Sequence, residues 1–506
     1  MTPEARLAPV LLVAGTASSV GKSVLVAALC RISRQDGVRV APFKAQNMSN
    51  NAAVTPDGLE IGRAQAEQAR AAGLEPSVEM NPVLLKPQGD RTSQLVLLGR
   101  PAGRLHSADF PSRKRDLWPD AARALDKLRG RFDLVIAEGA GSPAEPNLRA
   151  GDLANMRVAR HARGPALIVG DIDRGGVFAH LLGTLELLPP EDRALVRGFV
   201  INRFRGDPSL LGPAIEELQE RTGVPVLGVI PWIDDVGVAE EDAVALERAA
   251  SASGAAAVGE VDVVVVQLPR IANFDDFDPL VREPGVRVRY VRSAGEFGRP
   301  DLAVLPGTKA TVADLGWLRE RGLDRAIEAH AADGGAVLGI CGGLQMLGER
   351  LVDEDGVEAA PGTALRGLGL LPIATRFSAE KTTRRASGEV FASAGPWEGA
   401  SGLPVEGYEI HMGESAATRE DGVRPLLRLG GEPDGAVSPD GRVAGSYLHG
   451  LLHNDRLRAA LLHALGRRGR GIDASEEQRR EEAFDRLAAV VREHLDMQQV
   501  RELVGL

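Results

Sequence analysis

"VAGTASSVGKSVLVAALC" (residues 13–30) runs from an apolar segment through a loop of small residues into a second apolar segment. This pattern predicts a buried strand, a tight loop and a helix. Such a loop points backbone N–H groups and a helix N-terminus at phosphate oxygens. We expect Gly21 to lie in the turn, Lys22 to reach the outer phosphates and the Ser23 hydroxyl to hold Mg²⁺. The stretch therefore predicts an α/β nucleotide-binding domain.

The glycine spacing of this loop departs from the usual one. The first glycine normally lies five residues before Gly21, which is Thr16 here, whereas this chain has Gly15. The Gly-Thr pair resembles the variant loop of dethiobiotin synthetase and its relatives, which use ATP to make an acyl-type phosphate from a carboxylate. That resemblance implies that ATP is a co-substrate and that Thr16 belongs to its site. The alternative is an ordinary loop that happens to contain Gly-Lys-Ser.

Short apolar runs recur between amphipathic stretches along the chain. They occupy residues 9–15, 132–140, 165–171, 195–203 and 224–230, and later 261–269, 286–291, 301–307 and 336–342. This rhythm is typical of α/β domains with parallel sheets. Because 506 residues exceed one ordinary hydrophobic core, we expect two such domains. Residues 1–250 form the predicted synthetase domain, 251–260 a linker, 261–460 a second domain and 461–506 a helical C-terminal extension.

Composition excludes several classes of function. The chain has 60 Lys and Arg against 70 Asp and Glu, a net charge of −10, which argues against nucleic acid or an anionic membrane as the main partner. Two cysteines allow no disulfide framework and favour a reducing, cytoplasmic setting. The sequence contains neither a signal peptide nor an apolar run long enough to span a bilayer. We therefore expect small or phosphorylated ligands.

Three polar side chains near predicted strands are candidates for the ATP site. Glu138 ends an apolar run, where a carboxylate can hold Mg²⁺ beside Ser23, although a helix cap or surface group is the alternative. Lys44, in the polar stretch "PFKAQNMSNN" (42–51), can screen charge between a carboxylate and the γ-phosphate, unless that stretch is an ordinary exposed loop. Asn202 follows a strand where the related fold reads adenine, and a simple turn residue is its alternative.

"GDIDRGGVFAH" (170–180) also ends a predicted strand. Asp171, Asp173 and Arg174 either position metal and a substrate carboxylate, or cap a helix and pair with one another. The sequence leaves both interpretations open.

"LGICGGLQML" (338–347) places Cys341 between glycines at a predicted strand-to-helix turn. A nucleophilic thiol needs a base and donors for the oxyanion. The glycine spacing is that of a nucleophile elbow, in which the Gly342 N–H can face an oxyanion. A buried core cysteine is the alternative, but bulky apolar neighbours would suit that better than glycines. Gly307, at another strand end, can supply a second backbone donor.

Two histidines are candidate bases for Cys341. We favour His449, because it follows the apolar run "VAGSYL" (443–448), over His453. A core or surface histidine is the alternative for both.

These residues resemble class I glutamine amidotransferases. That family's elbow runs Gly-x-Cys-x-Gly with a Gln four residues after the Cys, and the resemblance implies that Gln345 helps bind glutamine. Most members carry a Glu two residues after the His, whereas Leu451 stands there in this chain. The sequence does not identify what orients His449. "GYEIHMG" (407–413) offers Glu409 and His411 for that role or for substrate contact.

An ordered set of motifs spans nearly the whole chain. It includes "FKAQNMSNN", "DGLEIGRAQ", "MNPVLLKP", "GAGSPAEPNL", "DIDRGGVFA", "INRFRGD", "PGTKAT", "GICGGLQML" and "GYEIHMG". The set resembles the corrinoid amidases, which join a dethiobiotin-synthetase-like domain to a glutaminase, and among them most closely the cobyric acid synthase family.

This resemblance implies ATP- and glutamine-dependent amidation of carboxylates b, d, e and g of adenosylcobyrinic acid a,c-diamide. Cys341 would release ammonia through a thioester, and ATP would activate the acceptor carboxylate. Two alternatives remain at this point. One is cobyrinic acid a,c-diamide synthase, and the other is a regulatory P-loop ATPase with an inactive glutaminase-like part.

Overall fold

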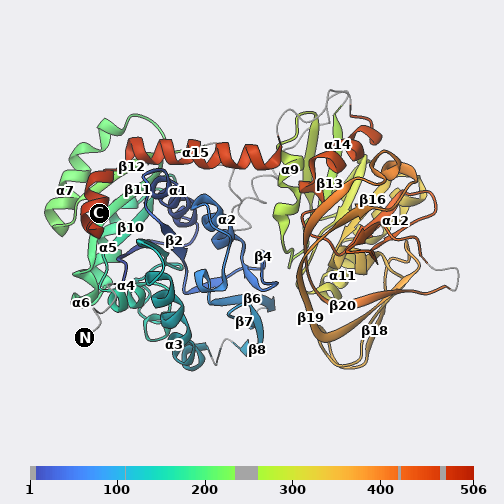
Figure 1. Cartoon of the computed structure of the whole chain (residues 1–506), viewed down its shortest axis with the longest axis horizontal. Helices are drawn as coiled ribbons and strands as arrows, with labels where there is room; N and C mark the ends of the chain where they lie inside the picture. The colour runs from blue at the N-terminus through green and yellow to red at the C-terminus, as the bar shows by residue number, and fades with distance from the viewer. Residues whose placement is uncertain are drawn as a thin grey trace. The chain divides into compact units, whose positions relative to one another are not determined.

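The chain folds into two compact units (Figure 1). The computed structural model describes residues 7–89, 91–106, 108, 110–233, 260–419, 423–467 and 475–506. The first unit comprises Met1–Ser49, Glu60–Asp242 and Glu477–Leu506, and the second comprises Asn50–Leu59 and Ala243–Glu476. No helix within the described residues is long and apolar enough to cross a membrane.

A six-stranded parallel sheet organises the first unit, in the order β12-β11-β10-β1-β9-β2. Its strands are β1 (Val10–Gly15), β2 (Val40–Phe43), β9 (Leu134–Glu138), β10 (Ala166–Asp171), β11 (Val196–Phe204) and β12 (Val226–Pro231). The predicted strands are thus confirmed in position, and their apolar residues are buried. Because the strands are parallel, their carboxyl ends share one edge, where the phosphate loop and Glu138 lie.

Helices and a smaller sheet complete the first unit. The helices are α1 (Lys22–Gln35), α2 (Arg63–Ala71), α3 (Phe110–Arg129), α4 (Met156–Ala162), α5 (Val177–Leu187), α6 (Pro190–Arg193) and α7 (Gly212–Thr222), with short 3-10 turns η1 (Val78–Met80), η2 (Arg149–Gly151) and η3 (Pro208–Leu211). The smaller sheet has the order β3-β6-β7-β8. Its strands are β3 (Gln46–Met48), β6 (Val83–Gly89), β7 (Thr92–Leu97) and β8 (Arg100–His106); β5 (Glu60–Gly62) precedes α2.

The C-terminal helices pack on the first unit. They are α15 (Glu476–His494) and α16 (Met497–Val504), drawn in red in Figure 1. One face of α15 is buried in one core with α1 and the parallel sheet, through Phe484, Leu487, Val491 and Leu495. Two ion pairs add to this contact, since Arg31 lies 2.7 Å from Asp485 and 2.8 Å from Glu481. The C-terminal extension predicted for 461–506 as helical thus contains two helices that pack on the first unit.

The second unit contains another mostly parallel sheet, in the order β14-β13-β15-β16-β24-β23, in which β23 alone is antiparallel to its neighbour. Its strands are β13 (Val261–Val266), β14 (Val286–Val291), β15 (Leu302–Leu305), β16 (Ala336–Ile340), β23 (Ala436–Val437) and β24 (Val443–Ser446). Its helices and turns are η4 (Phe274–Phe277), α9 (Asp278–Val281), α10 (Ala294–Phe297), α11 (Thr311–Glu320), α12 (Leu323–Ala332), α13 (Gly342–Leu347), η5 (Gly395–Ala400), η6 (Leu451–His453) and α14 (Asp455–Ala464).

A further sheet in the second unit was not predicted. It has the order β18-β17-β19-β21-β22, and β20 pairs with β19 as a long antiparallel ribbon. Its strands are β17 (Arg350–Asp353), β18 (Thr363–Arg366), β19 (Ile373–Val390), β20 (Pro404–Ala417), β21 (Leu427–Leu429) and β22 (Glu432–Asp434). Strand β4 (Ala52–Val54) belongs to this unit too, and the Arg385 Nε donates to the Val54 carbonyl at 3.1 Å.

The observed units correct the predicted domain boundaries. The predicted first domain, residues 1–250, is not one continuous piece, because the segment Asn50–Leu59 belongs to the second unit. The predicted linker at 251–260 lies, apart from Glu260, outside the described residues.

Candidate active sites

The phosphate loop of the first unit has the predicted order of strand, loop and helix. Gly21 has a left-handed φ of 93° immediately before α1. Lys22 donates to the carbonyls of Ala17, at 2.7 Å, and Gly141, at 3.2 Å. The shifted glycine has a steric reason, because a Cβ at Gly15 would lie 3.0 Å from the Lys22 Nζ. Glycine here leaves room for the lysine side chain to fold back over the loop.

The Glu138 carboxylate lies at the centre of the candidate ATP site and is 1% exposed. One oxygen accepts from the Ser23 hydroxyl at 2.8 Å and from the Lys44 ammonium at 2.9 Å. The other accepts from the Gln68 amide at 2.6 Å. Burial alone would raise the pKa of Glu138, but the charge of Lys44 and the hydrogen bonds from Lys44, Gln68 and Ser23 outweigh it and lower the pKa. The carboxylate is therefore ionised.

The Ser23 and Glu138 pair fits a magnesium ion. Both supply oxygen ligands, and their side chains are already in contact. In the described ranges no three His, Cys, Asp or Glu residues cluster as a metal site. Mg²⁺ is usually bound by one or two protein oxygens, and substrate phosphates and water complete its shell. A hydroxyl beside one carboxylate meets that requirement.

Asn202 and Thr16 lie against the same loop. Asn202 Nδ2 donates to the Val20 carbonyl at 2.9 Å, and a Cβ at Gly21 would lie 2.2 Å from that nitrogen. The Thr16 N–H donates to the Val169 carbonyl at 2.9 Å. Asn202 thus braces the loop from the end of β11.

The carboxylates at the end of β10 pair with arginines. Asp171 lies 3.0 Å from Arg203 and 3.8 Å from Arg174, and Asp173 lies 3.2 Å from Arg205. Their nearest partners, Arg203 and Arg205, lie outside the predicted set, and within the set only Asp171 and Arg174 approach each other.

Cys341 occupies a strained turn between β16 and α13. Its φ of 52° and ψ of −107° are unfavourable for a residue with a Cβ. The flanking glycines permit this turn: a Cβ at Gly343 would lie 1.9 Å from the Leu305 carbonyl oxygen, and one at Gly339 would lie 2.7 Å from the Leu344 nitrogen. This is the geometry of a nucleophile elbow.

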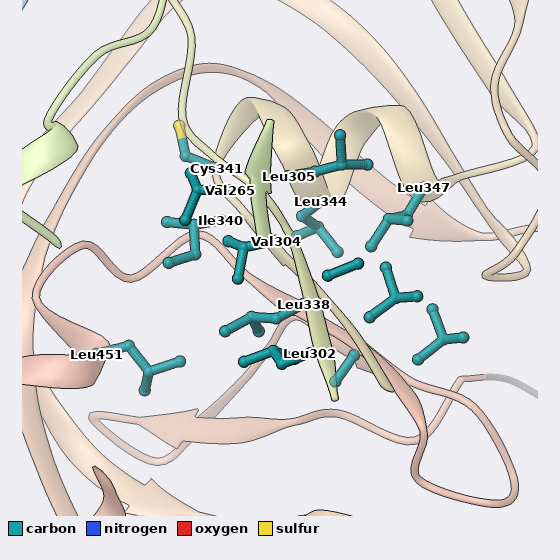
Figure 2. Close-up of a cluster of buried hydrophobic side chains, with 14 of the residues drawn as sticks. Val265, Leu302, Val304, Leu305, Leu338, Ile340, Cys341, Leu344, Leu347 and Leu451 are labelled. Carbon is teal, nitrogen blue, oxygen red and sulfur yellow. The ribbon is translucent and has the colours of Figure 1, made fainter. Parts of the chain in front are cut away.

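The Cys341 sulfur points away from the hydrophobic cluster beside it (Figure 2). The residue is 6% exposed. The other cysteine, Cys30, is fully buried in α1, and burial raises its pKa. The two cysteines therefore have different surroundings, and only Cys341 sits at a turn that presents its thiol.

His449 is held by a buried carboxylate, Asp276. The His449 Nδ1 and an Asp276 oxygen are 2.7 Å apart, and the other Asp276 oxygen accepts from the Gly450 N–H at 2.7 Å. Burial lowers the pKa of His449, but the charge and hydrogen bond of Asp276, with a hydrogen bond and charge interaction with Cys341, raise it to about 10. Tyr408 stacks on the imidazole with ring centroids 5.3 Å apart. Asp276 is thus the carboxylate that contacts His449, in a chain with Leu451 where most members of the resembled family carry a glutamate.

His453 has a different partner, the Asp275 carbonyl at 2.9 Å. Glu409 pairs with Arg384, and His411 stacks on Tyr447 with centroids 3.9 Å apart. Their described contacts give no support to the idea that Glu409 or His411 orients His449.

The predicted oxyanion residues surround the same centre. A Cβ at Gly307 would lie 2.8 Å from the His449 Cε1, and one at Gly342 would lie 3.2 Å from the Thr308 nitrogen. Gln345 is 2% exposed and bonds with protein groups: its oxygen accepts from Thr311 at 3.0 Å. Its nitrogen donates to the Met412 carbonyl and the Tyr447 hydroxyl, both at 3.3 Å. Gln345 is therefore held in place by Thr311, Met412 and Tyr447.

Sequence reasoning missed Asp276 and Gln68. Asp276 lies in "IANFDDFDP" (271–279), far from both Cys341 and His449 in the chain. The available signal was an acidic pair between Phe274 and Phe277, since aromatic flanks indicate a buried turn and a buried carboxylate needs a partner. Gln68 lies three residues beyond the quoted motif "DGLEIGRAQ", and nothing in its spacing pointed to Glu138.

Comparisons with known proteins find a family model for each of two parts of the chain. A family model described as a CobQ/CobB/MinD/ParA nucleotide binding domain matches residues 11–245, and one described as a CobB/CobQ-like glutamine amidotransferase domain matches 262–457. A solved structure titled "Crystal structure of glutamine amidotransferase" aligns with 40% of this chain and 98% of its own, at 23% identity and a TM-score of 0.30.

Curated relatives match over nearly their full length. Proteins named cobyric acid synthase from Roseiflexus castenholzii and Pelotomaculum thermopropionicum are 53% and 50% identical, each over 99% of this chain and over 99% and 97% of their own lengths. The relative of that name from Paracoccus denitrificans is 52% identical over 96% of this chain and 98% of its own. The chain therefore belongs to the cobyric acid synthase family, a family of glutamine-dependent amidating ligases.

Proposed function

We propose that this enzyme amidates carboxylates b, d, e and g of adenosylcobyrinic acid a,c-diamide, using ammonia from glutamine and acyl phosphates formed with ATP. The observation that carries the proposal is one chain with two assembled sites. One is the phosphate loop with Ser23, Lys44 and Glu138, and the other is Cys341 with His449 and Asp276. The enzyme would work in the cytoplasm, because a reducing compartment keeps the Cys341 thiol free.

The first site suits phosphoryl transfer to a carboxylate. Lys22 and the loop backbone would bind the phosphates of ATP, and Thr16 and Asn202 would help hold the loop and the base. Ser23 and Glu138 would hold Mg²⁺, which neutralises charge on the phosphate oxygens when bound. Lys44 would move between Glu138 and the incoming carboxylate as charge develops. An acyl phosphate gives the later amine attack a good leaving group.

The second site suits release of ammonia from a carboxamide. His449, which its pKa of about 10 keeps as an imidazolium, holds the proton that the Cys341 thiol has given up. The thiolate attacks the glutamine carboxamide while the N–H groups of Gly307 and Gly342 stabilise the oxyanion. The imidazolium then donates its proton to the departing ammonia, and water hydrolyses the thioester. The bond between Asp276 and Nδ1 fixes the imidazole ring, so that Nε2 faces the thiol and the departing ammonia.

The substrate assignment predicts a simple mass change. Cobyrinic acid a,c-diamide in its adenosylated form, incubated with enzyme, MgATP and glutamine, should exchange OH for NH₂ four times in succession. Mass spectrometry of the corrinoid measures each step. An unchanged mass would reject the proposed substrate, and a product stopped after fewer exchanges would reject the set of four positions.

Replacing the nucleophile should separate the two activities. Cys341→Ala and His449→Ala should lose glutamine-dependent amidation by about 10³-fold or more, because the thioester route is closed. Both should keep amidation with free ammonia, since the ATP site lies in the other unit. His453→Ala is the matched control, and its histidine bonds to a backbone carbonyl instead. Glutamine-dependent turnover in Cys341→Ala would overturn the nucleophile assignment.

Lys22→Ala should remove amidation with either nitrogen donor, because both depend on the activated carboxylate. Glutamine hydrolysis measured alone should survive. Ammonia-dependent amidation at the wild-type rate in this variant would remove ATP activation from the scheme.

Asp276→Asn should lower the glutaminase kcat by about 10²- to 10⁴-fold, as loss of an orienting carboxylate does in other triads. Asp276 raises the pKa of His449, so the imidazolium form persists until the pH passes about 10. Without that charge the pKa of His449 falls, and the alkaline limb of the glutaminase pH profile should move to lower pH. If the glutaminase rate of Asp276→Asn falls at the same high pH as that of the wild type, Asp276 does not raise the pKa of His449 in the working enzyme.

A further inference from the structure

The segment Asn50–Leu59 is far in sequence from the rest of the second unit. It lies inside the match to the nucleotide-binding family model, residues 11–245, yet it folds with the glutaminase. Its strand β4 accepts a hydrogen bond from Arg385 of β19 at the Val54 carbonyl. The glutaminase unit is therefore built partly from a segment that the family model assigns to the other domain.

Asn51 and Asn273 join this segment to the turn beside the proposed triad. The Asn273 N–H donates to the Asn51 Oδ1 at 2.8 Å, and the Ala52 N–H donates to the Asn273 Oδ1 at 2.8 Å. Asn51 is 4% exposed and Asn273 is 2% exposed. Two reciprocal bonds between buried groups hold the turn in one position, because losing either leaves a buried N–H unsatisfied.

The turn that Asn51 holds carries the carboxylate of the triad. Asn273 has a left-handed φ of 52° and directly precedes η4, which contains Asp276. The neighbouring Ala272 N–H donates to the Gly307 carbonyl at 2.9 Å, so the same turn contacts the proposed oxyanion loop. A shift of this turn would change the place of Asp276 against His449 and of Gly307 beside the imidazole.

We propose that Asn51 is a positioning residue of the glutaminase, which acts by fixing the turn Asn273–Asp276 so that Asp276 meets His449 in the productive geometry. The inference rests on the proposed function, in which His449 is the base. Asn51 touches neither substrate nor the reacting atoms in this scheme. It acts through the bond from the Asn273 N–H to its own Oδ1, next to the bond from the Ala52 N–H to the Asn273 Oδ1.

A positioning role and a merely structural role predict different kinetics. Loss of stability would reduce the amount of folded enzyme and leave the pH profile of the remainder unchanged. Misplacement of Asp276 would lower kcat with little change in the KM for glutamine. It would also weaken the interaction that raises the pKa of His449, whose other neighbours are Cys341 and the stacked Tyr408.

The test uses the full-length enzyme with glutamine alone, so that glutaminase is measured apart from amidation. Asn51→Ala removes the acceptor for the Asn273 N–H. Asn273→Gly removes the other acceptor and keeps the left-handed backbone, which glycine adopts without strain. Asp57→Ala is the matched control, because Asp57 lies in the same segment and is exposed. Ammonia-dependent amidation checks the first unit, and calorimetry checks folding of the whole chain.

We expect kcat to fall about 10- to 100-fold in Asn51→Ala and Asn273→Gly, as small displacements of catalytic groups do. The alkaline limb of the glutaminase pH profile should move to lower pH in both variants. The shift should have the same direction as in Asp276→Asn and should be smaller. The double variant should lose little more than either single one, because both remove the same constraint. Asp57→Ala should match the wild type.

Two failures can be told apart. Wild-type kcat and pH profile in Asn51→Ala, or a fall in kcat with the alkaline limb unmoved, would overturn the role of Asn51 and leave the triad standing. Glutamine hydrolysis by Cys341→Ala would instead overturn the proposed function on which this inference rests.

Discussion

The bond between Asp276 and His449 is the constraint on which the second site depends. Both side chains are 1% exposed, and an isolated charge at that depth would be strongly unfavourable. The Asp276 carboxylate is stabilised at this depth because it accepts hydrogen bonds from both the imidazole and the Gly450 N–H. The same two bonds fix the ring and the backbone after it. Burial therefore gives the histidine one orientation, and it ties the turn that carries Asp276 to the imidazole.

Glu138 plays a comparable part in the first unit. Its carboxylate is as deeply buried, and it binds Ser23, Lys44 and Gln68, which come from three separate stretches of the chain. In both units a buried carboxylate binds side chains that lie far from it in the sequence. The two acids differ in one respect: a lysine accompanies Glu138, whereas Asp276 is paired with a titratable imidazole. The first arrangement suits charge neutralisation and the second suits proton transfer.

The sequence predicted features that depend on local pattern. The phosphate loop and the elbow at Cys341 are strand-to-helix turns with glycines where a Cβ would collide with Lys22 or with the Leu305 carbonyl, so local pattern sufficed. Asp276 escaped prediction because its partner is 173 residues away, and only the fold brings them together. The long ribbon of β19 and β20 was missed as well, since its two strands are rich in charged residues and lack the apolar runs of buried strands.

The predicted domain boundaries differ from the observed units for a related reason. A segment of ordinary composition, Asn50–Leu59, leaves one unit for the other without a linker signal, and the helix α15 returns to the first unit at the C-terminus. Asn51 follows Lys44 in the same polar stretch, so one short length of chain supplies a partner of Glu138 and a partner of the Asp276 turn. The density of polar side chains in "PFKAQNMSNN" then has a physical explanation. Its buried polar groups are hydrogen-bonded within the fold: Lys44 donates to Glu138, Asn47 donates to Gln65, and Asn51 accepts from the Asn273 N–H.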